Sequence, residues 1–147
     1  MSAKLQTLLI LAIAVIAGCA ARPIAAPSPD DPLVGYWHAR DYQPLFGTTP
    51  ETLLERRSDG GFVFTIQGMT AGGGQGVQAE EGRWTRAGNR YTTITTRMTD
   101  GSFDATGLNI RDDYKVLMLD NNTVELLHIK TGAKFKATRV DAAFRLP

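Results

Sequence analysis

The sequence predicts an all-β fold, an antiparallel up-and-down barrel of about eight strands. Three observations support this prediction. From residue 33 onward, short segments alternate between apolar and polar side chains, as strands do when one face of a sheet is buried. Turn-forming residues separate these segments at short intervals, and no segment shows a convincing helical pattern. Consecutive hairpins build a meander, and closing the meander into a barrel removes its free edges.

Each strand is predicted from its own alternation and from the turns that bound it. The predicted strands are 33–42, 52–57, 62–67, 81–86, 90–98, 102–110, 114–119, 123–130 and 133–140, of which 102–110 has the weakest pattern. Asp59-Gly60 between two apolar runs is a strong hairpin signal. Asp112 and Asp113 are interpreted as turn formers, and the glycine-rich stretch 68–76 as a loop at one end of the barrel.

Composition excludes several classes of protein. The chain has 147 residues, of which 43% are hydrophobic and 21% charged, as in ordinary globular proteins. Sixteen Lys and Arg balance 15 Asp and Glu, so the chain has no basic surplus that would indicate nucleic-acid binding. Its single cysteine excludes an internal disulfide framework and a zinc site built from several thiolates.

The first residues are organised like an export signal. Lys4 precedes an apolar run over 8–17, and Gly18-Cys19 follows. The run is too short for a stable membrane-spanning helix, which needs about 20 residues. The stretch Ile16-Ala17-Gly18-Cys19 resembles the lipobox of bacterial lipoproteins, which implies cleavage of residues 1–18 and acylation of Cys19, for example by palmitate. The alternative is an ordinary secreted protein in which Cys19 is an incidental thiol.

The lipoprotein resemblance also implies a location. Ala20 follows the cysteine where an Asp would indicate retention in the inner membrane, so we expect an outer-membrane lipoprotein facing the periplasm. Its partner would be the lipid bilayer, held through the acylated Cys19. Residues 19–32 contain four prolines and are predicted to form an extended linker. The folded domain is then 33–147.

Three short motifs resemble those of the lipocalins. Gly35-x-Trp37 lies on the first predicted strand, Asp113-Tyr114 at the start of a late one, and Arg139 on the last. This order is similar to the three conserved regions of that family, although Asp112 stands where the family has a threonine. The resemblance spans about 33–140 and implies that Gly35, Trp37, Asp113, Tyr114 and Arg139 have structural roles in closing the barrel.

The residues themselves explain how such closure would work. Trp37 can fill the closed end with a large apolar ring, and the guanidinium of Arg139 can lie over it. Gly35 leaves room for a close approach of neighbouring chain. The alternative interpretation makes Trp37 an ordinary core residue and Arg139 an exposed charge at a sheet edge.

The leading functional hypothesis is a non-enzymatic protein that binds or carries a small hydrophobic ligand in the barrel. The side chains expected to line the cavity are Phe62, Phe64, Ile66, Trp84, Val116, Met118, Leu126 and Phe135. Segments 41–50 and 68–76 could cover its opening. Two alternatives stand beside it: the same side chains simply pack a solid core, or the lipoprotein acts as an inhibitor or scaffold that contacts other envelope proteins.

The sequence shows no recognisable motif for a catalytic, metal or cofactor site. No Gly-x-Ser-x-Gly element occurs, and the stretch 68–76 lacks the ending of a phosphate-binding loop. His38 is expected to point to solvent, whereas His128 alternates in phase with Val124 and Leu126 and could point inward. Glu80 and Glu81 are adjacent on a strand and therefore face opposite ways. We expect no cofactor, no metal and no catalytic residue.

Overall fold

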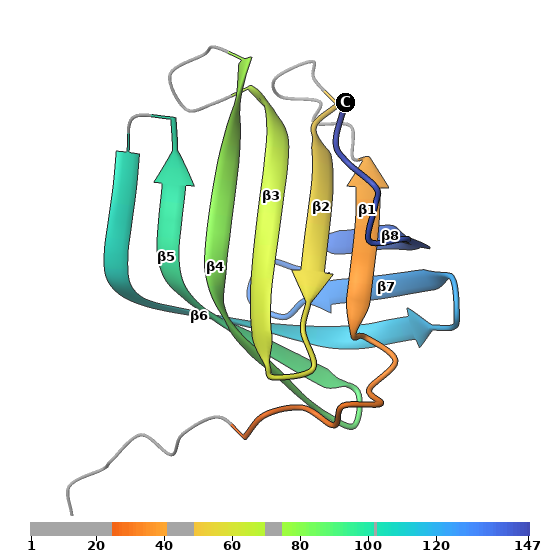
Figure 1. The fold of residues 1–147 in the computed structure, drawn as a ribbon. Helices are drawn as coiled ribbons and strands as arrows, with labels where there is room; N and C mark the ends of the chain where they lie inside the picture. The colour runs from red at the N-terminus through yellow and green to blue at the C-terminus, as the bar shows by residue number, and fades with distance from the viewer. Residues whose placement is uncertain (1–24, 41–48, 70–74, 102) are drawn as a thin grey trace, which may run out of the picture.

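The computed structural model describes residues 25–40, 49–69, 75–101 and 103–147, which form a closed antiparallel barrel (Figure 1). Its strands are β1 (Gly35–Arg40), β2 (Glu51–Arg56), β3 (Gly61–Met69), β4 (Gln75–Ala87), β5 (Arg90–Asp100), β6 (Phe103–Leu119), β7 (Thr123–His128) and β8 (Lys134–Val140). Each strand pairs with the next, and β1 pairs with β8. The predicted fold class, an up-and-down barrel of about eight strands, is confirmed.

The hairpins form where turn residues provide the required backbone. Gly60 has a φ of 85° between β2 and β3, and the Arg57 amide donates to the Gly61 carbonyl over 2.9 Å. Between β6 and β7 the Asp120 carboxylate accepts hydrogen bonds from the amides of Asn122 and Thr123, at 2.8 and 2.7 Å. These side-chain bonds replace the ladder bonds that the backbone loses at the turn.

Two predicted strands, 102–110 and 114–119, are one continuous strand, the 17-residue β6. The prediction that Asp112 and Asp113 form a turn is therefore wrong. Both carboxylates find partners within the sheet: Asp112 on the inner side with His128, and Asp113 on the outer side with Arg90 and Arg111. Paired in this way, two adjacent aspartates remain in extended backbone.

The strands β3 and β4 are longer than predicted. Gly68 pairs with Gly76 and Met69 with Gln75, so the ladder extends into the stretch predicted as a loop. Residues 70–74 of that stretch lie outside the described residues, as does most of the other predicted cover, 41–48. The covering role expected for these two segments stays a prediction.

Closure of the barrel centres on Trp37 and Arg139, which the structure brings together. The two residues pair across β1 and β8, and the guanidinium carbon of Arg139 lies 4.2 Å from the centroid of the buried Trp37 ring. The indole Nε1 donates to the Leu33 carbonyl over 2.9 Å. Gly35 has a φ of +124°, and a Cβ there would lie 2.6 Å from Nη1 of Arg139. Gly35 thus makes room for the guanidinium.

Arg139 also ties the closed end of the barrel together through backbone carbonyls. Its Nε donates to Asn121 over 2.7 Å, its Nη1 to Val34 over 2.8 Å, and its Nη2 to Pro32. One side chain therefore joins β8, the β6–β7 turn and the segment that leads into β1. Hydrogen bonds from a charged donor are stronger than neutral ones.

The segment 25–34 lies against this same closed end, below the barrel in the view of Figure 1. Pro27 is buried, and the Asp31 carboxylate forms a 2.8 Å ion pair with Nε of Arg86 on β4. Leu33 is fully buried in the core cluster with Trp37 and Trp84. The part of the predicted linker that the structure describes is thus partly attached to the domain.

Asp113 and Tyr114 have roles different from that of the Trp37–Arg139 pair. Asp113 accepts a 2.6 Å hydrogen bond from Thr92 and pairs with Arg90 and Arg111, so it holds β5 against β6 on the outside. Hydrogen bonds from Arg90 and then Arg111 lower the pKa of this carboxyl well below its usual range. Tyr114 points inward and packs between Tyr91 and His128.

We expect Arg139→Ala to lower the free energy of unfolding by about 2–3 kcal/mol, because it removes the cation–π contact and charged hydrogen bonds at the seam. Urea denaturation measures this. Arg145→Ala is the matched control, because within the described ranges Arg145 donates to carbonyls of its own tail alone, at Ala142 and Phe144. An equal loss in both variants would contradict a special role for Arg139.

The Asp113 cluster predicts a pH-dependent stability. Because the folded-state pKa of Asp113 is lowered, its contribution is fully present above the unfolded pKa of about 3.9 and is lost as the pH falls through the folded value. Asp113→Asn should therefore be less stable than the native chain at pH 7, and the difference should shrink below about pH 4. Urea denaturation from pH 7 to 3 tests this, with the exposed Asp30→Asn as control. A difference that does not change with pH would refute it.

Candidate functional site

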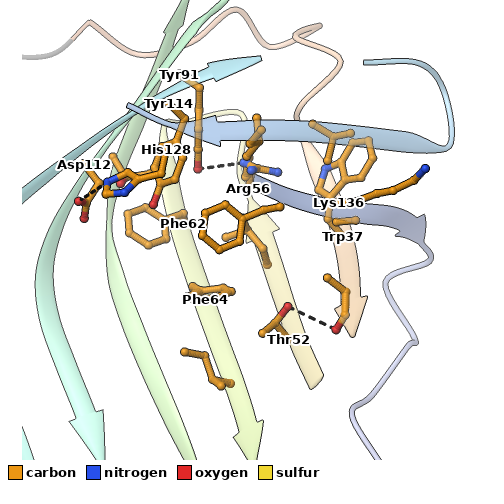
Figure 2. Close-up of a pocket in the computed structure, with 18 of the residues that line it drawn as sticks. Trp37, Thr52, Arg56, Phe62, Phe64, Tyr91, Asp112, Tyr114, His128 and Lys136 are labelled. Atoms are coloured by element: carbon orange, nitrogen blue, oxygen red, sulfur yellow. Dashed lines mark hydrogen bonds and ion pairs between the residues drawn. The ribbon is translucent and has the colours of Figure 1, made fainter. Parts of the chain in front are cut away.

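The described strands surround a cavity of about 650 Å³, which the described residues leave open at one end. All eight strands contribute to its wall. On β2 and β3 the lining residues are alternate positions, as expected for one face of a sheet, and Figure 2 shows several of them pointing into the cavity. Thr52, Leu54 and Arg56 face it from β2, and Phe62, Phe64 and Ile66 from β3. A cavity of this size falls within the usual range for small-molecule sites, roughly 300–1,000 Å³.

The interior has a packed part and a hollow part. Leu33, Trp37, Trp84 and Val124 are buried at 0–1% exposure and fill the closed end. β1 begins beside this cluster and ends at Arg40, which belongs to the cavity wall together with Pro50. The opening therefore lies at the end of the barrel opposite to the segment 25–34.

Five of the eight side chains predicted to line the cavity do so: Phe62, Phe64, Ile66, Leu126 and Phe135. Trp84 does not, because it lies in the packed closed end, where its Nε1 donates to the Arg57 carbonyl over 3.1 Å. Val116 also packs against the core cluster rather than lining the cavity.

Met118 does not line the cavity either, and the reason is a β-bulge. The register of β6 against β7 shifts between Val116 and Met118, so that Met118 lies opposite Glu125, and Leu119 opposite the buried Val124. The extra residue, Leu117, inverts the alternation, so Met118 is 37% exposed and Leu119 packs inward. A one-residue shift of this kind moves every following side chain to the other face.

The most unusual residue of the wall is Arg56, which the sequence analysis did not single out. Its side chain is 2% exposed, its Nε donates to the Tyr91 hydroxyl over 3.0 Å, and its guanidinium carbon lies 4.5 Å from the Tyr91 ring centroid. Its Nη1 is buried and has no hydrogen-bond partner among the described residues. Its alternation with Thr52 and Leu54 is the sequence signal that could have indicated an inward position.

A row of aromatic rings leads away from Arg56 across the barrel (Figure 2). The ring centroids of Tyr91 and Tyr114 are 5.5 Å apart, and those of Tyr114 and His128 are 5.0 Å apart. Nε2 of His128 lies 3.1 Å from Oδ1 of Asp112. Burial, followed by the negative charge of Asp112, raises the pKa of Tyr114, so its hydroxyl remains a hydrogen-bond donor at neutral pH.

The acidic groups of the wall lie at the other end of this row. Burial, followed by the nearby Asp112, raises the pKa of Glu80, although a 3.4 Å hydrogen bond from Thr95 opposes the shift. Glu81, the next residue, faces outward and lies 3.5 Å from Arg97. The adjacent glutamates thus face opposite ways.

The two histidines have different surroundings. His128 belongs to the cavity wall and also contacts the Thr131 hydroxyl at 2.7 Å. His38 lies on the outer face, where it contacts Glu51 at 3.1 Å and its ring packs 4.7 Å from that of Phe144. Its side chain is only 18% exposed, so it lies on the outer face but does not point freely to solvent. In the described ranges, no group of three or more His, Cys, Asp or Glu side chains is arranged to hold a metal ion.

Comparison with models of known protein families gives no match, and comparison with the curated proteins gives none either. Within the described part of the chain, no helix is long and apolar enough to cross a membrane. The described residues form a largely apolar cavity with a buried cation at one point of its wall and acidic groups at another.

Proposed function

We propose that this chain is a non-enzymatic binding protein that holds or carries a small, largely apolar molecule inside its barrel. The observation that carries the proposal is the cavity of about 650 Å³, whose wall includes Leu54, Phe64 and Ile66. A closed barrel of this strand number is just wide enough to be filled by side chains or to hold one small ligand. Here the side chains fill only the closed end.

The resemblance to the lipocalins supports the same proposal. The closed antiparallel barrel is compatible with a lipocalin-like fold. The Trp37–Arg139 contact is the arrangement that the resemblance implies, and it keeps the closed end sealed while the other end stays open. Exchange of the ligand through that opening would require no break in the barrel.

We further propose that the protein is an envelope lipoprotein anchored in a bilayer through Cys19, which lies outside the described residues. The support is the signal-like segment ending in Gly18-Cys19. Several acyl chains on one cysteine hold a protein to a membrane far more firmly than one chain does. The outer membrane, with the domain in the periplasm, is the expected location.

The cavity proposal predicts binding of a neutral apolar fluorophore, N-phenyl-1-naphthylamine, with saturable enhancement of its fluorescence. Leu54→Trp should weaken this binding at least about fivefold, because the larger ring occupies the cavity. The matched control is Leu53→Trp, since Leu53 is the preceding residue of β2 and faces the outside.

Circular dichroism should show both variants folded. Absence of saturable enhancement in the native chain, or equal effects of the two substitutions, would count against a cavity ligand.

The anchoring proposal predicts that the chain incorporates an alkyne analogue of palmitate when it is expressed in a bacterium, and that Cys19→Ser abolishes the incorporation. The native protein should fractionate with the envelope membranes, and the variant should not. Labelling that persists in Cys19→Ser would contradict the proposal, because it would show that the lipid attaches at another residue.

A further inference from the structure

Arg56 is a buried cation without a counter-ion in the described structure. It is 2% exposed, and none of the ion pairs formed by the described residues involves it. Its one hydrogen bond to a described residue runs from Nε to the Tyr91 hydroxyl, and Nη1 is buried with no described partner. A guanidinium has several further N–H donors, and it stays charged at any physiological pH.

Leaving such a group unpaired is energetically unfavourable. Burial removes its hydration, and the contact with the Tyr91 face returns only part of that loss. The two acidic groups of the cavity wall do not compensate it, because Asp112 is bound to His128 and Glu80 to Thr95. Arg56 and Asp112 are separated by three rings that contact one another in turn, those of Tyr91, Tyr114 and His128.

The geometry points to a ligand that supplies the missing negative charge. We propose that Arg56 binds the carboxylate of an amphiphilic monocarboxylate whose hydrocarbon part fills the cavity. This inference rests on the proposed function and names the class of its ligand. One guanidinium matches one negative charge, and its planar edge presents parallel N–H donors to the two oxygens of a carboxylate.

Tyr91 completes the anion site. The Tyr91 hydroxyl accepts from Arg56, so its own hydrogen can point to a carboxylate oxygen. The Tyr114 side chain belongs to the same wall, and its ring packs against that of Tyr91. Figure 2 shows Tyr91 beside Arg56, and Tyr114 next to Tyr91 on the side of His128. An anion beside Arg56 would meet the guanidinium and the Tyr91 hydroxyl as donors, whereas the carboxylates of Asp112 and Glu80 act on Tyr114, whose pKa burial raises and these charges raise further.

The rest of the cavity suits a hydrocarbon chain. From Arg56 the inner positions of β2 continue with Leu54 and Thr52, and Phe64 and Ile66 lie beside them on β3. At about 3.3 Å per residue, the path from Arg56 to Thr52 is roughly 13 Å long, which suits an extended chain of about ten carbon atoms. The ligand would lie with its acid group innermost and its tail toward the opening.

The test compares dodecanoate with dodecanol, which share the same hydrocarbon chain. Both are used to displace N-phenyl-1-naphthylamine from the delipidated full chain at pH 7.5. We expect the native chain to bind the acid at least tenfold more tightly than the alcohol, as a charge-assisted hydrogen bond predicts. Arg56→Met should reduce that preference below about threefold while the affinity for dodecanol changes little.

The matched control is Arg57→Met, because Arg57 is the next residue but points outward and pairs with Glu55 at 2.9 Å. It should keep the full preference for the acid. Should Arg56→Met fail to fold, the side-chain ¹⁵N spectrum of arginine in the native chain decides: dodecanoate, but not dodecanol, should shift one buried guanidinium resonance, and the shift should be weaker in Tyr91→Phe.

The outcomes separate the two proposals. Equal affinity of the native chain for acid and alcohol would overturn the role of Arg56 and leave the binding function intact. An undiminished preference in a folded Arg56→Met would overturn it as well. Failure of the fluorophore and of both dodecyl compounds to bind would instead contradict the cavity function itself.

Discussion

The pairing of β1 with β8 is the constraint on which the rest of the barrel depends. All the other strand pairs join neighbours along the chain, whereas this one joins residues more than a hundred positions apart. Among the described residues, three pairs join the two strands: Tyr36–Val140, Trp37–Arg139 and His38–Thr138. Bringing such distant segments together costs loop entropy, and so short a ladder returns little of it. Arg139 strengthens the seam because its guanidinium lies on Trp37 and bonds carbonyls on both sides.

The closed end, where Trp37 and Arg139 meet, is the packed part of the interior, because Trp37, Trp84 and Leu33 fill it with large side chains. Toward the other end, the described side chains leave the cavity of about 650 Å³. The polar groups inside are not randomly placed: the cation lies beside Tyr91, and the acidic groups lie beyond Tyr114 and His128. A molecule in this cavity would experience a field that favours one orientation over the reverse.

Much of the fold could be predicted from the sequence because tight turns and alternation are local signals. Asp59-Gly60 and Asp120-Asn121-Asn122 turn the chain where expected, and Phe62, Phe64 and Ile66 share the inner face of one strand. The failures have tertiary causes. Asp112 and Asp113 stay in a strand because of partners on other strands, and the bulge at Leu117 reverses the face of Met118. The sequence of the strand alone predicts neither the aspartate pairing nor the bulge.

The candidate site was predicted only in its apolar part. Phenylalanines at alternate positions indicate an inner face. Arg56 and Tyr91 are far apart in the sequence and come into contact only when the barrel closes, so neither residue alone indicates the site. Charged side chains are rarely buried, so a prediction based on apolar periodicity does not place Arg56 inside the barrel.

The attachment of segment 25–34 to the sealed end has a consequence for how the molecule would be presented. Pro27 and the Asp31–Arg86 ion pair fix the incoming chain on that side, while the opening lies at the far end of the strands. The described chain therefore enters the barrel from its closed end. In the proposed lipoprotein, the cavity would open away from the membrane. The ligand would then be exchanged with the aqueous surroundings rather than taken directly from the bilayer.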